Sequence, residues 1–359
     1  LVVSVLAVVN QATDYRVRFP LPDDSVPSGW GVNLGFGEIT PIQVKRFKEG
    51  GFRWVRRDLF WHEVETKKGV YDFAKWDRMM ARLKPLGIRP IMILCYGNGL
   101  YQQGPPTTPE ARKAFTNYVR AAVKHFRRRG VLWEMWNEPN NHHWGAPPNV
   151  GDYYRLAEDV GRLFKSEFPD EWRALPAIAG FDWPWLTGLA EGGNPLLSLY
   201  DAVTVHPYRP MEPETAAADY ARLRALIGPK KPILSGEWGY SGQGHNVSDA
   251  VQTQYFVRQY LANLASGVPM SIWYNWNNNG PNRKVLGDNF GILTEHFQPK
   301  APFLAAKSLL GRIGGWKYDK RLALASDREW VLLFRKGTAL RAVAWTTDRK
   351  PATVRVPWG

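Results

Sequence analysis

The stretch Trp133-Glu134-Met135-Trp136-Asn137-Glu138-Pro139-Asn140 decides the fold of this chain. Residues 131–136 are apolar apart from Glu134, which is typical of a buried strand, and the Asn-Glu-Pro sequence ends this strand abruptly. A second apolar run, Pro232-Ile233-Leu234-Ser235-Gly236-Glu237-Trp238, also leads a glutamate into a turn rich in glycine and aromatic residues. Both sites therefore predict a carboxylate at the C-terminal end of a strand.

Short apolar segments alternate with amphipathic segments between Trp30 and Gly314. The segments predicted as strands are 30–35, 52–58, 88–95, 131–137, 175–181, 201–206, 232–237 and 269–275. Helices are predicted over 40–49, 75–86, 108–129, 149–168, 214–227, 248–266 and 300–312, with a weaker helical signal at 185–199. This alternation predicts an α/β fold, a (β/α)8 TIM barrel over 30–314, with its active site in the longer loops that follow the strands.

The pattern changes after Gly315, where the sequence becomes rich in β-forming residues. Strands are predicted over 322–325, 329–336, 339–346 and 352–356, with a hairpin turn at 336–338. We therefore expect a small C-terminal β subdomain over 315–359. The N-terminal segment 1–29 is expected to contribute strands within 1–19 that pack on this subdomain.

Composition excludes several classes of protein. The chain has 359 residues, 44% of them hydrophobic and 22% charged, which suits a globular protein with a full core. No apolar run is long enough to span a membrane. The single cysteine, Cys95, excludes an intrachain disulfide framework and a multi-cysteine metal site.

The net charge of +14 favours an anionic partner such as an acidic polysaccharide, although scattered basic residues are also typical of a solvated surface. Here the basic residues are spread over many of the predicted helices. A nucleic-acid binder would interleave basic and aromatic residues on one face. In this chain the aromatic residues gather in the loops instead, which disfavours that class.

The two strand-end glutamates are the candidate catalytic pair. Glu138 ends the fourth predicted strand and Glu237 the seventh, so the two face each other across the mouth of a barrel. Retaining glycosidases use two carboxyl groups about 5–5.5 Å apart, one as acid and base and one as nucleophile. Asn137, directly before Glu138, is placed to bind a sugar 2-hydroxyl. A solvated loop glutamate is the alternative for either carboxylate.

At these motifs the chain resembles the clan A glycoside hydrolases. The resemblance is stronger to family 39 and related cellulase-like barrels than to family 5. The resemblance implies that Glu138, in Asn137-Glu138-Pro139, is the acid/base and that Glu237, in Gly236-Glu237-Trp238-Gly239, is the nucleophile. It covers roughly residues 30–314. The part after the barrel is smaller than in common family 39 enzymes.

The same resemblance implies supporting residues. Within Val203-Thr204-Val205-His206-Pro207-Tyr208, it implies that Tyr208 bonds Glu237 and that His206 lines the pocket. Arg56 resembles the second-strand arginine that keeps the nucleophile ionised, and Trp273 the eighth-strand tryptophan that forms a sugar platform. We expect an arginine to lower the pKa of Glu237, and desolvation to raise that of Glu138.

Aromatic side chains supply further candidates, because flat rings stack on the C–H faces of sugars. Many of the 17 tryptophans fall in predicted strand-to-helix loops. The residues predicted to contact substrate are Trp61, Trp144 and Trp276, with Asn98 and Asn277 as polar contacts. A wide aromatic rim of this kind favours an open groove and endo cleavage of a polymer.

No metal or cofactor is expected. His142-His143 is a pair without carboxylate ligands at a regular spacing, which seldom forms a metal site. The sequence thus predicts a retaining O-glycosyl hydrolase that acts on a poly- or oligosaccharide. A non-catalytic carbohydrate-binding barrel and a transglycosylase with the same residues are the alternatives. A polymer substrate would place the protein outside the cytoplasm, as a secreted or periplasmic enzyme.

Overall fold

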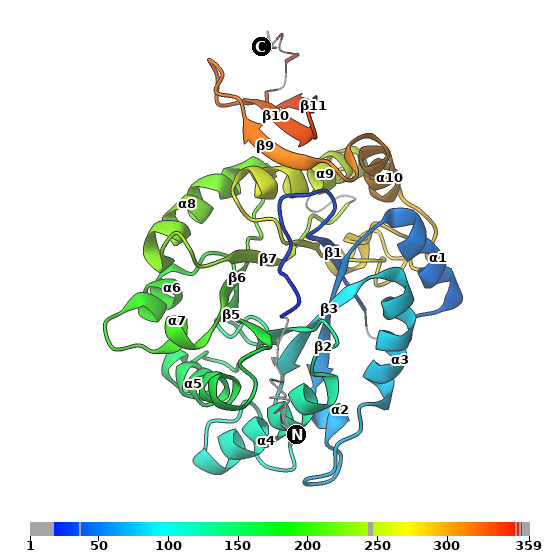
Figure 1. The fold of residues 1–359 in the computed structure, drawn as a ribbon. Coiled ribbons are helices and arrows are strands. Elements are labelled where there is room, and N and C mark those ends of the chain that lie inside the picture. The colour runs from blue at the N-terminus through cyan, green and yellow to red at the C-terminus, as the bar shows by residue number, and fades with distance from the viewer. Residues whose placement is uncertain (1–17, 36, 243–246, 349, 352, 354–359) are drawn as a thin grey trace, which may run out of the picture.

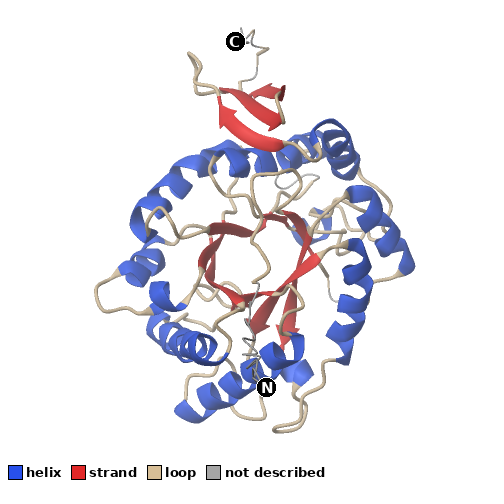
Figure 2. Ribbon diagram, in the orientation of Figure 1, coloured by secondary structure: helices blue, strands red, loops and turns tan. Residues whose placement is uncertain are grey.

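The computed structural model describes residues 18–35, 37–242, 247–348, 350–351 and 353. Eight parallel strands close into a barrel in chain order, and helices surround them (Figures 1 and 2). The strands are β1 Trp30–Asn33, β2 Trp54–Phe60, β3 Arg89–Cys95, β4 Leu132–Met135, β5 Trp172–Ala179, β6 Ala202–His206, β7 Ile233–Trp238 and β8 Ser271–Trp273. The predicted TIM barrel is confirmed, although β5 begins three residues earlier than expected.

The helices follow the predicted amphipathic segments. They are α1 Pro41–Gly50, α2 Trp61–Val64, α3 Ala74–Leu83, α4 Pro109–Phe126, α5 Val150–Glu167, α6 Trp183–Ala190, α7 Leu196–Leu199, α8 Ala216–Ile227, α9 Asp249–Ala265 and α10 Ala301–Ile313, with 3-10 turns at Lys84–Leu86, Pro213–Thr215 and Leu286–Asn289. In α4, Thr108 caps the N-terminus by accepting the N–H of Ala111, and Pro109 occupies the first turn. Among the described residues, none of the helices is long and apolar enough to cross a membrane.

The N-terminal end of the barrel is closed by an apolar cluster. It comprises Trp54, Ile91, Leu132, Ala174, Ala202, Leu234, Met270 and Ile272. Leu21 packs against this cluster, and the segment 18–29 crosses the barrel opening in Figure 1. Arg18 anchors the segment through an ion pair of 2.5 Å with Asp201. Access to the barrel interior is therefore from the C-terminal ends of the strands.

A three-stranded antiparallel sheet follows the barrel, in the order β11-β10-β9. Its strands are β9 Lys317–Arg321, β10 Glu329–Lys336 and β11 Ala339–Thr346, so the predicted hairpin turn at 336–338 is confirmed. The prediction of a strand over 322–325 was wrong. The strand that precedes the hairpin is β9, whose charged sequence Lys-Tyr-Asp-Lys-Arg lacks apolar alternation and takes its conformation from pairing with β10.

The segment before β1 runs beside the start of this sheet. Ser25 forms an antiparallel bridge with Lys317, and the backbone N–H of Tyr318 donates to the carbonyl of Asp24 at 2.9 Å. The strands predicted within 1–19 lie almost wholly on residues 1–17, outside the described part of the chain. In the strand predicted over 352–356, only residue 353 is described.

A buried ion pair joins the C-terminal sheet to the barrel. Glu214 accepts from Arg258 at 2.6 and 2.7 Å, and from the indole Nε1 of Trp345 on β11 at 2.7 Å. The side chain of Glu214 is 5% exposed. Because Trp345 also stacks on Trp330 with ring centroids 5.5 Å apart, the carboxylate fixes this sheet against α9 and the 3-10 turn that precedes α8.

We predict that Glu214→Gln lowers the free energy of unfolding by about 3 kcal/mol, because the substitution leaves the buried charge of Arg258 without a counter-ion. Urea denaturation followed by tryptophan fluorescence measures this difference. Glu212→Gln, two residues earlier and less buried, is the control and should change the value by less than about 0.5 kcal/mol. Equal stability of the two variants would contradict this role of Glu214.

Candidate active site

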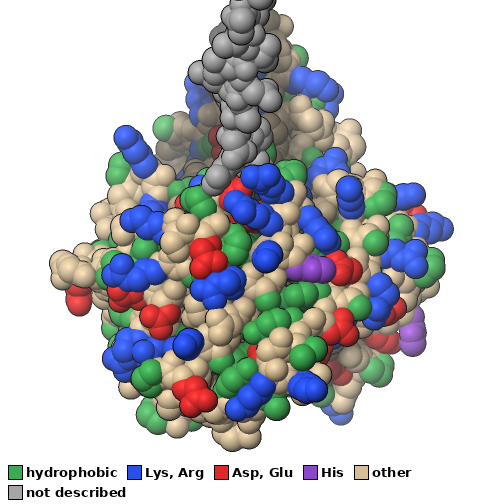
Figure 3. Space-filling model, turned by 60° about the horizontal axis from the view of Figure 1, so that its bottom comes forward, with side chains coloured by type: hydrophobic (Ala, Val, Ile, Leu, Met, Phe, Trp, Pro, Cys, Tyr) green, Lys and Arg blue, Asp and Glu red, His purple; other side chains and the backbone are tan. Residues whose placement is uncertain are grey.

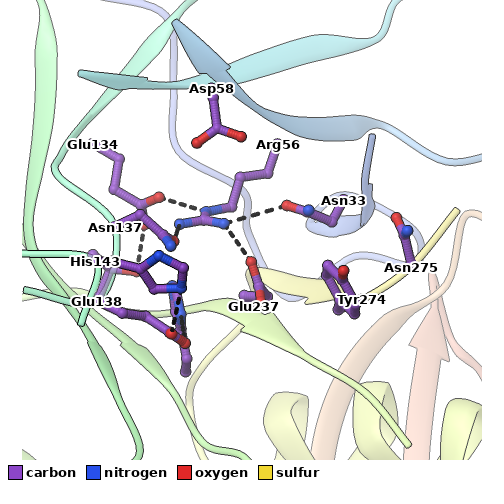
Figure 4. Close-up of polar contacts among 12 residues, drawn as sticks. Asn33, Arg56, Asp58, Glu134, Asn137, Glu138, His143, Glu237, Tyr274 and Asn275 are labelled. Carbon is purple, nitrogen blue, oxygen red and sulfur yellow. Dashed lines mark hydrogen bonds and ion pairs between the residues drawn. The ribbon is translucent and has the colours of Figure 1, made fainter. Parts of the chain in front are cut away.

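The guanidinium of Arg56 lies at the centre of the candidate site (Figure 4). Arg56 comes from β2 and is 1% exposed. Its Nε donates to Glu134 at 2.5 Å and its Nη1 to Glu237 at 2.6 Å. Its Nη2 donates to Oδ1 of Asn137 at 2.7 Å, and Nη1 also reaches Oδ1 of Asn33 at 3.3 Å. One side chain thus links the ends of β1, β2, β4 and β7.

The two strand-end glutamates lie together at the mouth of the barrel. Carboxylate oxygens of Glu138 and Glu237 and a ring nitrogen of His206 all lie within 4.8 Å of one another. This spacing suits the short separation of carboxyl groups in retaining glycosidases and leaves too little room for the water that an inverting enzyme places between them. Each glutamate side chain is 13% exposed, so both are accessible from the mouth.

The backbone at the end of β4 is strained in a way that projects Glu138 into the mouth. Trp136 and Glu138 have φ angles of 67° and 47°, in the left-handed region that costs a non-glycine residue about 1–3 kcal/mol. The N–H of Glu138 donates to the carbonyl of Ala177 at 2.8 Å, and the amide of Asn140 both donates to and accepts from the backbone of Ala179. Bonds to β5 therefore hold the strained turn in place.

Each carboxylate has its own hydrogen-bond partners. His206 Nδ1 lies 2.9 Å from Oε1 of Glu138, and Asn141 donates to the other oxygen at 2.8 Å. His143 Nε2 stands 3.7 Å from that second oxygen. The hydroxyl of Tyr208 donates to Oε1 of Glu237 at 2.8 Å, opposite the oxygen that Arg56 contacts.

Hydrogen bonding and burial separate the pKa values of Glu138 and Glu237. The pKa of Glu138 is lowered and that of Glu237 is raised, which is the reverse of what we expected. Burial opposes ionisation of Glu138, but hydrogen bonding and the charge of His206, with the amide of Asn141, lower its pKa to about 2. Burial raises the pKa of Glu237 against the attraction of Arg56. The two carboxyl groups therefore titrate as a coupled pair, in which ionisation is favoured more strongly at Glu138 than at Glu237.

Arg56 acts to lower the pKa of Glu237, as expected, but burial outweighs this effect. The sequence analysis also missed Glu134, which shares Arg56 with Glu237. Glu134 is 1% exposed, and it competes with Glu237 for the charge of Arg56 while accepting a second hydrogen bond from Thr204 at 2.8 Å. The signal was present in the sequence, since Glu134 is the single charged residue in an apolar strand. A buried charge in such a strand indicates a paired partner across the barrel.

The four tryptophans predicted to contact substrate are buried in the core instead. The exposed fractions are 1% for Trp61, 3% for Trp144, 1% for Trp273 and 0% for Trp276. Trp276 stacks on Phe47 with centroids 4.2 Å apart, and the indole of Trp273 donates to the carbonyl of Phe290. These rings fill the space between strands and helices, so no sugar can stack on them, and all four predictions were wrong.

The two asparagines predicted as sugar contacts differ in their access to the mouth of the barrel. Asn98 is 4% exposed, and its amide donates to the carbonyl of Glu65 at 2.8 Å, so it holds the loop after β3 and the prediction for it was wrong. Asn277 lines a cavity at the mouth, as predicted for a polar contact, although its own amide donates to the carbonyl of Asn278. The sequence analysis missed Tyr274, beside Glu237 in Figure 4, which lines the same cavity.

The cluster of Glu138, His206 and Glu237 could also supply three ligand atoms to a metal ion. A cation bound there would lie beside the guanidinium of Arg56, which contacts Glu237 at 2.6 Å. Repulsion between the two positive charges disfavours a metal at this position. The geometry suits acid/base and nucleophilic chemistry better than metal coordination.

Sequence comparison relates the chain to known glycosidases. It is 26% identical to a beta-xylosidase from Geobacillus stearothermophilus, over 95% of this chain and 77% of the relative. It is 27% identical to an endoglucanase from a Microbulbifer species, over 46% of this chain and 30% of the relative. The chain resembles the family 39 glycoside hydrolases. No family model matches it.

Solved structures support the fold assignment. A family 39 glycoside hydrolase from Bacteroides cellulosilyticus superposes with a TM-score of 0.76 at 23% identity, covering 89% of this chain and 70% of that chain. A family 39 beta-xylosidase from Caulobacter crescentus gives a TM-score of 0.67 at 22% identity, covering 88% and 77%. At these identities the likeness shows the barrel fold, and the arrangement of the side chains must carry the function.

We predict that Glu134→Gln lowers the pKa of Glu237, because Arg56 then has one carboxylate less to neutralise. A carboxyl group whose pKa is raised on folding contributes stability at low pH that is lost as pH rises through its folded pKa. Stability should therefore fall less between pH 4.5 and 7 in the variant than in the wild type, by about 1 kcal/mol.

Urea unfolding at a series of pH values measures this difference. Thr204→Val is the matched control, since it removes the hydroxyl that bonds Glu134 but keeps the charge, and it should retain the wild-type pH dependence. An unchanged or steeper fall in the Glu134→Gln variant would show that Glu134 does not compete for Arg56.

Proposed function

We propose that this protein is a retaining glycoside hydrolase that cleaves a poly- or oligosaccharide by double displacement. The observation that carries the proposal is the pair Glu138 and Glu237, whose oxygens lie within 4.8 Å at the ends of β4 and β7. Arg56 and Tyr208 hold Glu237 from two sides, so one carboxylate is oriented while the other faces His206. The resemblance to family 39 enzymes supports the same assignment.

In the first step, an oxygen of Glu237 forms a bond to the anomeric carbon as the bond from that carbon to the leaving oxygen breaks. Glu138 transfers its proton to the leaving oxygen. In the second step, Glu138 takes a proton from water, and the water oxygen displaces Glu237 from the anomeric carbon. Arg56 fixes Oδ1 of Asn137, and the amide N–H groups of Asn137 are then donors to Tyr96 and to the sugar 2-hydroxyl.

A proton must lie on Glu138 for this reaction, whereas hydrogen bonding lowers the pKa of Glu138 and burial raises that of Glu237 in the free site. A bound glycosidic oxygen accepts a hydrogen bond only from the protonated form of Glu138, so substrate binding favours that form. The two carboxylates titrate as a pair, and the transfer changes the place of the proton without changing the total charge. His206 and Asn141, which stabilise ionised Glu138, are the groups that oppose the transfer.

We propose β-linked neutral sugars such as xylosides and glucosides as substrates, and the similarity to a beta-xylosidase and an endoglucanase supports this class. Endo cleavage was predicted from aromatic loops, but the tryptophans chosen there are buried. Endo action therefore stays a prediction, and the length distribution of the products tests it. A polymer substrate also implies a secreted or periplasmic location.

We predict that Glu237→Gly and Glu237→Gln lose more than about 10³-fold of the wild-type kcat, because no nucleophile remains. Azide should restore turnover of an activated aryl β-glycoside in Glu237→Gly, giving a glycosyl azide of inverted configuration. NMR of the product determines its anomeric configuration. Glu63→Gln, a surface glutamate paired with Lys75, is the control that should keep wild-type activity.

The alternatives give different results in the same experiments. Ordinary activity in either Glu237 variant would show that Glu237 is not the nucleophile. Tight polysaccharide binding without product from the wild type would indicate a non-catalytic carbohydrate-binding barrel. Products longer than the supplied oligosaccharide would indicate transglycosylation, in which a sugar rather than water reacts with the intermediate.

A further inference from the structure

A cavity of about 490 Å³ opens at the mouth of the barrel. Its lining is dominated by amide and carboxylate side chains: Asn33, Glu38, Gln43, Asp58, Asn275, Asn277 and Asn279, with Tyr274. Asn33 also accepts a hydrogen bond from Arg56, and Tyr274 lies next to Glu237 in Figure 4. Tyr274 is close enough to interact electrostatically with both Asp58 and Glu237, so it connects the cavity to the catalytic pair, which lies outside the lining.

Asp58 is a carboxylate in this lining that the reaction leaves unused. It follows Arg56 by two residues on β2, so both side chains lie on the interior face of the barrel. Its Oδ1 accepts a hydrogen bond from the thiol of Cys95 at 3.3 Å, which is a weak donor. Within the described part of the chain, no lysine or arginine nitrogen lies within ion-pair distance of Asp58.

A partly buried carboxylate with so little compensation is costly unless a ligand completes its hydrogen bonds. Burial raises the pKa of Asp58, with the charge of Arg56 acting in the opposite direction. Sugar hydroxyls are suitable donors, because two neighbouring hydroxyls can donate to the two oxygens of one carboxylate.

The charges around the cavity also select the ligand. Arg56 already donates to Glu134, Glu237, Asn137 and Asn33, so four of its five N–H groups are committed. Among the described residues, the cavity lining contains no lysine or arginine, but it contains Asp58 and Glu38. A sugar carboxylate bound here would face these two carboxylates and the charge of the catalytic pair, with no cation left to neutralise it.

We propose that Asp58 binds hydroxyl groups of the sugar that becomes bonded to Glu237, and that this subsite accepts neutral sugars and rejects uronic acids. This inference rests on the proposed glycosidase function and deepens it. The basic surface does not alter this preference for neutral sugars over uronic acids. Lysine and arginine side chains are scattered among acidic ones on the face shown in Figure 3. Asp58 is thus a specificity-determining residue.

The test compares wild type, Asp58→Asn and Asp58→Ala on 4-nitrophenyl β-xyloside, β-glucoside and β-glucuronide. We expect the wild type to prefer the neutral glycosides by more than about 100-fold in kcat/KM, because the glucuronide brings an unpaired charge. Asp58→Asn should reduce kcat/KM for the better neutral glycoside by about 10- to 100-fold, mostly through a higher KM. The substitution should also reduce the ratio of kcat/KM for the neutral glycoside to kcat/KM for the glucuronide.

Asp319→Asn, which removes the same charge from β9 in the C-terminal sheet, is the matched control and should behave as the wild type. Thermal unfolding of each variant establishes that it is folded. An Asp58→Asn variant with wild-type KM and selectivity would overturn the proposal, and so would a wild type that hydrolyses the glucuronide as well as the neutral glycosides.

A second measurement uses the wild type alone and needs no aryl glycoside. The sugar bonded to Glu237 becomes the reducing end of the released product, so borohydride reduction and mass spectrometry identify it after digestion of a polymer with mixed neutral and uronic residues. A neutral alditol supports the proposal, and a reduced uronic acid overturns it. Absence of product from every glycoside and polymer would instead overturn the glycosidase function itself.

Discussion

The buried guanidinium of Arg56 is the interaction on which the rest of the site depends. Burial opposes its charge, but Glu134 and Glu237 raise its pKa and keep it ionised. A buried cation of this kind is stable only when its donors are matched, and here they meet carboxylates and amides from four strands. The guanidinium therefore orders the strand ends as well as Glu237, and loss of one carboxylate leaves the other as its counter-ion.

The barrel provides the rigidity that this arrangement requires. The N-terminal end is filled by the first residues of the strands and covered by Leu21, so the polar groups are confined to the other end. Glu134 lies deeper in β4 than Glu138, and the strained turn between them directs the two glutamates to different partners. One strand and the turn that ends it thus supply both a structural counter-ion and a reacting carboxylate.

The sequence predicted the barrel and the strand-end carboxylates because alternating apolar segments, and the polar residues that end them, are local signals. It could not predict the direction of the tryptophans, since a ring at a strand end fits the core as well as a sugar, and Trp276 and Trp61 pack inward. Nor could it predict how Arg56 is shared, because that depends on which side chains from distant strands meet. Charged β9 was missed for the same reason, as its pairing and not its composition makes it a strand.

The central claim is that Glu237, held by Arg56 and Tyr208, forms the bond to the sugar. Covalent trapping with 2,4-dinitrophenyl 2-deoxy-2-fluoro-β-glycosides of xylose and glucose, followed by peptide mapping, tests it most directly. We expect one added glycosyl group per chain, on the peptide that contains Glu237. A label on Glu138, or on any residue outside the pair, would show that Glu237 does not form this bond.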